Sequence, residues 1–233
     1  MPYVIPVQGS AHKRAVPSAR RHYAQHGFGR RLQTLRRSLG NVFKVVPPGT
    51  LKVPVKNRLY DAQINIQAFV ANAYGSADNL AWIWIFERGL EKEISRKQVG
   101  LRKHHTEVRS RLGPELRQYL EHLDPWFEYL VEYRDALAHR IPLYIPPGAV
   151  LTKNIDAYNA LMVGMNAAIN RFDSSEYERL SEEQSKLFVF QPLITHSITE
   201  TTAHYAFHAQ LIADFLTIEE LGLKMLDELR RGN

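Results

Sequence analysis

Two side chains near residue 140 have the chemistry to act on a phosphate ester. Arg134 and His139 stand five residues apart in the stretch DPWFEYLVEYRDALAHRIP, and Asp135 directly follows the arginine. The planar guanidinium of arginine matches phosphate oxygens, and histidine is the side chain whose ordinary pKa lies nearest neutrality. Such a pair could bind a phosphate and move a proton beside it.

A single helix is expected to position this pair. Asp124 and Pro125 are typical of a helix N-cap and a first helical residue. Pro142 prevents continuation and biases the residue before it away from helical geometry. We therefore predict a helix over about 125–140. One apolar sector of it, with Arg134 in its middle, is formed by Phe127, Leu130, Leu137 and Ile141, with Trp126, Val131 and Tyr133 at the margins.

An arginine in an apolar sector needs an anion, because an unpaired buried guanidinium costs several kcal/mol. The anion could be a carboxylate of the same fold, for which Asp78 is the first candidate and Asp61 the second. It could instead be the phosphate of a bound ligand, which the fork of the guanidinium also suits.

The six residues RDALAH, from Arg134 to His139, resemble the Arg-x4-6-His motif of the HEPN superfamily. Members often carry Asn, Asp or His directly after the arginine, as Asp135 is here. The resemblance covers these six residues and, more loosely, the helical stretch 57–142. The same Arg-to-His spacing occurs twice more in the chain. Only this copy combines an arginine on an apolar sector, a polar residue after it and a helix about to end.

The resemblance implies an all-helical, usually dimeric domain that cleaves RNA without metal or cofactor, in a cleft at the dimer interface. His139 would be the general base or acid, and Arg134 would stabilise charge on the phosphate in the transition state. Tyr133, Asp135 and Arg140 would contact the substrate, and an antitoxin-like protein is a further expected partner. A five-residue helical step turns about 140°, so the pair converges only if the last turn unwinds or a second subunit supplies one member.

The alternative hypothesis is a non-catalytic helical module that binds RNA or a protein, with Arg134 in a structural ion pair. Composition allows both. The chain of 233 residues fits one domain with an appendage, and no apolar run is long enough to span a bilayer. The absence of cysteine excludes disulfides and thiolate metal sites and agrees with a reducing cytoplasm, where we expect the protein.

Charge divides the chain in two. Residues 1–60 hold twelve Lys or Arg and no Asp or Glu, whereas residues 61–233 hold eighteen basic and twenty-four acidic side chains. We predict a basic N-terminal arm and Pro/Gly linker over 1–56, followed by a helical HEPN-like domain over 57–233. A basic amphipathic helix in the arm could lie on nucleic acid, on an anionic membrane or across the acidic body. An Arg-rich, acid-free N-terminus also resembles an organellar transit peptide.

The rest of the chain predicts an all-α fold, an up-and-down helical bundle. A packed helix is expected from residue 57 to Gly89, with a kink or division at Gly75-Ser76. A charged, solvent-exposed helical stretch is expected over 91–121, interrupted at Gly113-Pro114. Segments 143–150 and 187–194 are expected either to pair as a small β-hairpin or to form loops, with helices over about 154–170 and 175–187 between them. The capping box Ser197–Glu200 predicts the start of the last helix. His204 and His208, four residues apart in it, have metal-ligand spacing but no obvious third ligand.

Overall fold

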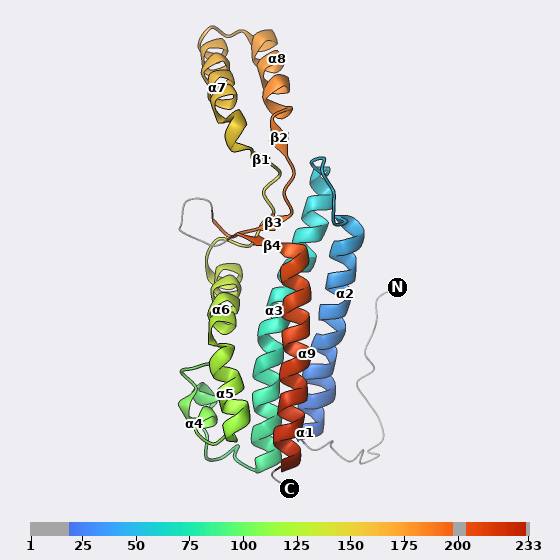
Figure 1. The fold of residues 1–233 in the computed structure, drawn as a ribbon, viewed down its shortest axis with the longest axis vertical. Coiled ribbons are helices and arrows are strands. Elements are labelled where there is room, and N and C mark those ends of the chain that lie inside the picture. The colour runs from blue at the N-terminus through green and yellow to red at the C-terminus, as the bar shows by residue number, and fades with distance from the viewer. Residues whose placement is uncertain (1–18, 198–203, 232–233) are drawn as a thin grey trace, which may run out of the picture.

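The structure, a computed structural model, describes residues 19–197 and 204–231, and helices dominate them (Figure 1). The longer helices are α2 (Gly29–Val45), α3 (Lys56–Arg88), α5 (Pro114–His122), α6 (Asp124–His139), α7 (Ile155–Asn170), α8 (Ser174–Ser185) and α9 (Phe207–Arg231). The short ones are α1 (Ala19–His22) and α4 (Thr106–Arg109), with a π-helical turn at Tyr23–Phe28 and 3-10 turns at Arg96–Gln98 and Thr152–Asn154. The predicted all-α class is confirmed. Within these ranges no helix has both the length and the apolarity needed to cross a bilayer.

The main body is an up-and-down bundle. In the view of Figure 1 the chain runs up α2, down α3, up through α5 and α6, and finally down α9. A buried cluster fills the bundle near the strands, with side chains from α2, α3, α6 and α9. A second buried cluster joins the lower half of α3 and α9 to α5 and to the loops before it. The α7–α8 hairpin is an excursion between α6 and α9.

Residues 19–45 belong to the packed body. The π-helical turn links α1 to α2 without a break, and Leu35 and Val42 of α2 are fully buried. They share one cluster with Ile66 of α3 and Ile218 of α9. The sequence left three possible surfaces for the basic amphipathic helix: nucleic acid, a membrane or the body of the protein. The apolar side of α2 packs on the body.

Helix α3 is the spine of the bundle and runs unbroken for 33 residues. It begins at Lys56, next to the expected boundary, and ends at Arg88, where Gly89 caps it in the left-handed conformation with φ 67°. The sequence predicted a kink or division at Gly75-Ser76, but the helix continues there. Gly75 has a packing role instead, because a Cβ at this position would overlap the guanidinium of Arg31.

The prediction of an exposed charged helix over 91–121 is wrong for most of that stretch. Only α4 and α5 are α-helical there, and loops with a 3-10 turn form the remainder. The loops carry buried side chains, among them Ile94 and Leu101, and Val108 of α4 is buried as well. Ile94, Leu101 and Val108 stand seven residues apart, a spacing that also fits a helical stripe, so the sequence pattern alone does not reveal that most of the stretch packs on the bundle as loops.

The predicted pairing of 143–150 with 187–194 is confirmed in part of each segment. Strand β1 (Ala149–Val150) pairs antiparallel with β2 (Phe188–Val189), and Tyr144 bridges to Thr195. A second antiparallel pair, β3 (Leu193–Ile194) with β4 (Tyr205–Ala206), was not expected. Because β4 occupies 205–206, α9 begins at Phe207 and not at the predicted capping box, whose Thr199 and Glu200 lie outside the described residues.

Candidate functional site

Arg134 lies at the edge of the buried face of α6 and not at its centre. The fully buried positions of this helix include Leu130, Tyr133 and Ala136, while the side chain of Arg134 is 29% exposed. Ile141, expected to complete the apolar sector, follows the end of the helix and is 48% exposed. The buried face of α6 is therefore centred closer to Tyr133 than the sequence predicted, and Arg134 at its edge is half-buried.

The guanidinium of Arg134 has two partners. Its Nη1 lies 2.9 Å from a carboxylate oxygen of Asp135, and its Nη2 donates to the hydroxyl of Tyr74 at 2.6 Å. Its Cζ also lies 4.1 Å from the centre of the Tyr74 ring, within the range of a cation–π contact. The anion that Arg134 requires is thus the carboxylate next to it in the chain.

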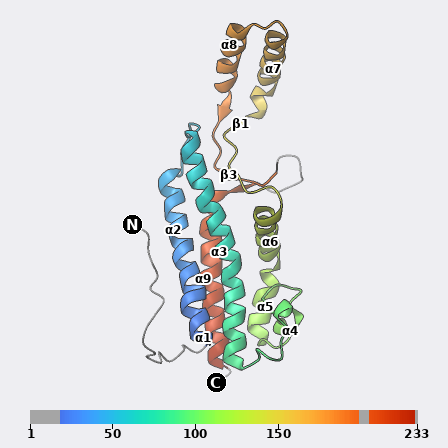
Figure 2. The ribbon, with the colours of Figure 1, turned by 180° about the vertical axis from the view of Figure 1, so that it is seen from behind.

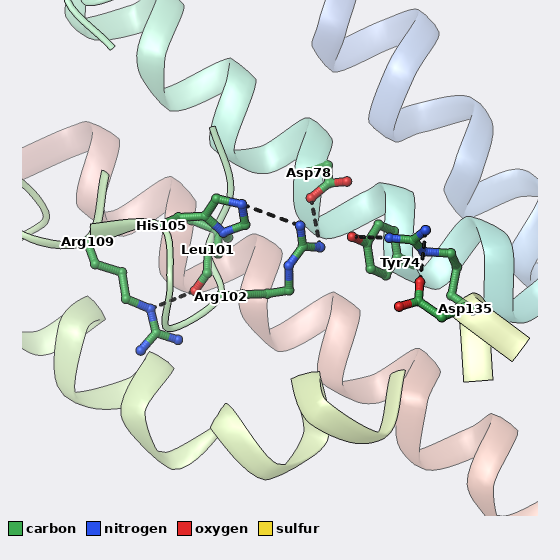
Figure 3. A network of polar contacts seen from close by, with 8 residues as sticks. Tyr74, Asp78, Leu101, Arg102, His105, Arg109 and Asp135 are labelled. Atoms are coloured by element: carbon green, nitrogen blue, oxygen red, sulfur yellow. Dashed lines mark hydrogen bonds and ion pairs between the residues drawn. The ribbon is translucent and has the colours of Figure 1, made fainter. Parts of the chain in front are cut away.

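A second arginine reaches the same tyrosine. Arg102, from the loop before α4, places its Cζ 4.5 Å from the centre of the Tyr74 ring and pairs with Asp78 at 3.3 Å. Figure 3 shows Tyr74 and Asp78 projecting from α3 toward these guanidinium groups. We refer to Tyr74, Asp78, Arg102, Arg134 and Asp135 as the Tyr74 cluster.

Asp78 was the first candidate to pair with Arg134, and the structure pairs it with Arg102 instead. Burial raises the pKa of the Asp78 carboxyl, and the charges of Arg102, Arg134 and Arg31 oppose that rise. Arg134 therefore acts on Asp78 only through its charge. Asp61, the second candidate, is exposed near the start of α3, thirteen residues or about 20 Å along the helix from Tyr74.

The imidazole of His139 does not reach this cluster. Helix α6 stays helical through His139, so the last turn does not unwind, and the five-residue step turns the histidine about 140° from Arg134. His139 is exposed and has no hydrogen bond or ion pair with any residue that the structure describes. Within one chain the motif pair is therefore not assembled around a common phosphate position.

The three residues expected to contact a substrate take different positions. Tyr133 is fully buried, and its hydroxyl donates to the carbonyl of Ile194 at 3.2 Å, so its side chain is not open to a substrate. Asp135 is 42% exposed and pairs with Arg134. Arg140 is exposed at the end of α6, beside His139. The structure brings Asp135 to Arg134, puts Tyr133 in the core and leaves His139 and Arg140 together on the surface.

Sequence reasoning missed the buried polar contacts of the loop that carries Arg102. Arg109, only 8% exposed, donates from Nε to the carbonyl of Leu101 at 2.7 Å and from Nη2 to Asp124 at 2.5 Å. Asp124, expected as an N-cap, thus holds an arginine, and α6 has no side-chain cap. His105 is also buried, and burial together with the charge of Arg102 lowers its pKa to about 4. The apolar residues in 91–112 stand mostly at spacings that a helix would also show, so they gave no signal that this stretch folds inward as loops.

A basic face runs along the outside of α2. Exposed on it are Arg30, Arg36, Arg37 and Lys44, which we call the α2 basic face. None of the four forms an ion pair within the described part of the chain, and residues 1–60 contain no acidic side chain. Arg31 points the other way, where its Nε donates to Asn79 at 2.9 Å and its Nη1 to Asn72 at 3.2 Å.

The two histidines with metal-ligand spacing do not form a metal site. His204 is exposed and precedes both β4 and α9, whereas His208 is buried and its Nε2 lies 2.6 Å from the carbonyl oxygen of Val46. Across 19–197 and 204–231, no three His, Asp or Glu side chains gather into a group that could hold a metal ion.

Comparison with known proteins found no family model, no curated protein and no solved structure that matches this chain. The likeness to the HEPN motif therefore stays with the six residues that carry it. A function for this protein is therefore proposed from its own surface, charges and contacts.

Proposed function

We propose that this protein is a non-catalytic helical module that binds RNA through the α2 basic face. The observation that carries the proposal is the set of exposed arginines and a lysine on one side of α2, in a segment without any acidic residue. Such a surface neutralises phosphates and releases the counterions that surround a nucleic acid. Two adjacent arginines, Arg36 and Arg37, supply planar forks suited to phosphate oxygens.

The packing of α2 favours RNA over an anionic membrane. A helix that lies in a membrane interface inserts its apolar side among the lipids. In this protein the apolar side of α2, including Leu35 and Val42, is buried against α3 and α9. Only the charged side is available, and a polyphosphate chain can engage it without inserting any side chain.

Salt-dependent binding to single-stranded RNA tests this function. We expect the logarithm of the binding constant to fall linearly with the logarithm of salt concentration. The double variant Arg36→Glu/Arg37→Glu should lose at least about tenfold in affinity and lower that slope by roughly one to two. Both side chains are exposed, so the fold is kept. Deletion of residues 1–50 would be a poor test, because it would remove Leu35 and Val42 from the core.

The matched control is Lys92→Glu/Lys97→Glu, which makes the same change in net charge on exposed residues of the loop after α3. It should keep both the affinity and the salt slope. Equal losses in the two double variants would mean that total charge and not the α2 basic face attracts RNA. That result, or the absence of RNA binding by the native chain at low salt, overturns the proposal.

A second candidate is a metal-independent HEPN-type endoribonuclease that works as a homodimer in the cytoplasm. The observation that favours it is the exposure of His139 and Arg140 at the end of α6, where a second subunit could meet them. His139 would move the proton of the 2′-hydroxyl, and Arg134 of the partner subunit would stabilise the charged transition state. An antitoxin-like protein that covers this end of α6 would inhibit the reaction.

Cleavage of RNA in the presence of a chelator tests the second candidate. General acid–base catalysis contributes roughly 10²–10⁴-fold, so His139→Ala should reduce cleavage by at least two orders of magnitude. His139 is exposed, and the variant should melt at the temperature of the native protein. Absence of cleavage by the native chain, or equal cleavage after the substitution, rejects the enzymatic function and leaves the binding function untouched.

A further inference from the structure

The α7–α8 hairpin projects beyond the end of the main body (Figure 1), and the view from behind in Figure 2 shows the same separation. The pairing of β1 with β2 forms its neck. Helix α7 packs closely on α8, where a Cβ at Gly164 would lie 3.0 Å from Leu180. This hairpin therefore has to bury its apolar side chains without help from the bundle.

Two helices cannot complete such a core. Only Met165 and Ala168 of α7 and Leu180 of α8 are buried within them. Stable domains place a further layer against the apolar side of a helix pair. Helix α8 has no need of one, because its outer side carries an ion-pair ladder in which Arg179 bonds to Glu176 and Glu183 at 2.7 Å each. The helix that lacks a packing layer on its exposed side is α7.

The exposed side of α7 carries several apolar side chains and almost no charge. Asp156 is the only charged residue among its sixteen, yet Val163 is 69% exposed, Ile169 54% and Ile155 44%. Phe172, just after the helix, is 97% exposed. Exposed apolar side chains scattered singly are normal on a protein surface, but several of them along a helix with a single charged residue mark a contact surface.

The exposed row on α7 reads the same in both directions. Its members follow one another at steps of four, three, four and three, the spacing of a coiled-coil seam: Ile155, Asn159, Met162, Asn166 and Ile169. All five are exposed. The order of residue types, isoleucine, asparagine, methionine, asparagine, isoleucine, is symmetric about Met162, with the isoleucines seven residues away on each side and the asparagines three residues before and four residues after it. When two copies of this helix are laid side by side in opposite directions, residues of the same type in the row face one another.

We propose that α7 docks antiparallel on α7 of a second copy of this chain, with a two-fold axis at Met162. Each Ile155 then meets Ile169 of the partner subunit, and each Asn159 meets Asn166 of the partner subunit. The paired amides can satisfy one another, because each has both donors and an acceptor. The two hairpins together form a four-helix arrangement in which every α7 side chain of the row is covered.

Charge and symmetry select a second copy as the occupant. An isologous interface places the same surface patch on both sides, so any charged residue in it faces a like charge or must be paired. The row on α7 contains none. A polar residue within an apolar seam also fixes the register, since shifting the helices would set each asparagine against an apolar side chain. This docking does not depend on RNA binding or on the motif around Arg134.

Cross-linking through single cysteines tests the register, because the native chain contains no cysteine. Met162→Cys should become a covalent dimer when the full chain is treated with a short bis-maleimide. A mixture of Asn159→Cys and Asn166→Cys chains should cross-link more efficiently than either variant alone. The control Glu178→Cys, exposed on α8, should stay monomeric.

Disruption of the seam gives an independent readout of mass in solution. Met162→Arg places two arginines across the axis, and should shift the sedimenting species from a dimer to the 26.8 kDa of one chain. Glu178→Arg should leave the dimer intact, and circular dichroism should show equal helix content for both variants. A native chain that sediments as a monomer at micromolar concentration overturns the proposal. So does cross-linking of Met162→Cys only to Leu216→Cys, which would place α7 on the exposed side of α9.

Discussion

The guanidinium of Arg134 stacks on Tyr74 and bonds to its hydroxyl, with Cζ 4.1 Å from the ring centre and Nη2 2.6 Å from the oxygen. This contact joins α6 to the middle of α3, sixty residues earlier in the chain. The carboxylate partner, Asp135, is 42% exposed and is therefore partly screened by solvent. Most of the free energy contributed by Arg134 should accordingly come from Tyr74.

Replacement of Arg134 measures that contribution. A charge-assisted hydrogen bond and a cation–π contact are together worth about 1–3 kcal/mol, so Arg134→Ala should lower the free energy of unfolding by about that amount. Tyr74→Phe keeps the ring and should cost less, about 0.5–1.5 kcal/mol. Urea denaturation measures both, with His139→Ala as a control expected within about 0.5 kcal/mol of the native chain. Full stability of Arg134→Ala would show that the contact contributes nothing.

The ion pair of Arg109 with Asp124 should be more costly to break. Arg109 is nearly buried, and its guanidinium also donates to the carbonyls of Leu101 and Leu120. Asp124→Ala leaves this buried charge without its carboxylate, which typically costs about 3–5 kcal/mol. Arg109→Leu removes the charge itself and should cost less than Asp124→Ala. Thermal melts of the two variants give the order, and the reverse order would mean that Asp124 matters mainly for the start of α6.

The bounds of α6 were predictable because local chemistry sets them, with Pro125 in its first turn and Pro142 just beyond its end. The pairing of segments 143–150 and 187–194 was one of two outcomes that the sequence left open, since both are extended and rich in β-forming or proline residues. These are properties of a few neighbouring residues.

The partner of Arg134 was not predictable from the sequence. Asp78 lies on the expected helix, but it pairs with Arg102, from a loop where the sequence predicted an exposed helix. The aromatic partner, Tyr74, is fixed only by the way α3 and α6 cross. The sequence also did not determine that the apolar side of α2 packs on the body. A basic amphipathic helix can lie on several surfaces, and tertiary contacts select one of them.

His105 should make the protein less stable in acid. Burial and the charge of Arg102 lower its pKa to about 4, so the folded protein holds the ring neutral, whereas an unfolded chain protonates it near pH 6.5. The stabilisation is fully present above about pH 6.5 and is lost as pH falls toward 4. His105→Gln cannot titrate and should flatten this part of the stability curve. The difference in unfolding free energy between the native chain and the variant, measured from pH 7 to 4, should change by about 1–3 kcal/mol.

Asp214 of α9 should change the stability in the opposite direction from His105, because its contribution is greatest in acid and is lost as pH rises. Burial raises the pKa of its carboxyl to about 6, although Trp126, Gln210 and Tyr129 all donate hydrogen bonds to it. Because the folded-state pKa lies above the ordinary 3.8, the folded protein binds the proton more tightly than the unfolded chain does. The resulting stabilisation is fully present below about pH 4 and is lost as pH rises through 6.

Asp214→Asn separates the charge from the hydrogen bonds. The amide oxygen can accept from Trp126 and Gln210, and the amide nitrogen can donate to the hydroxyl of Tyr129. The variant therefore keeps the network without a buried charge, and should be about 1–3 kcal/mol more stable than the native chain at pH 7. That gain should shrink as pH is lowered to 4. Asp214→Ala leaves the donors of Trp126 and Tyr129 without an acceptor and should be less stable than the native chain at every pH. If both variants lose stability at pH 7, the negative charge of Asp214 itself stabilises the fold.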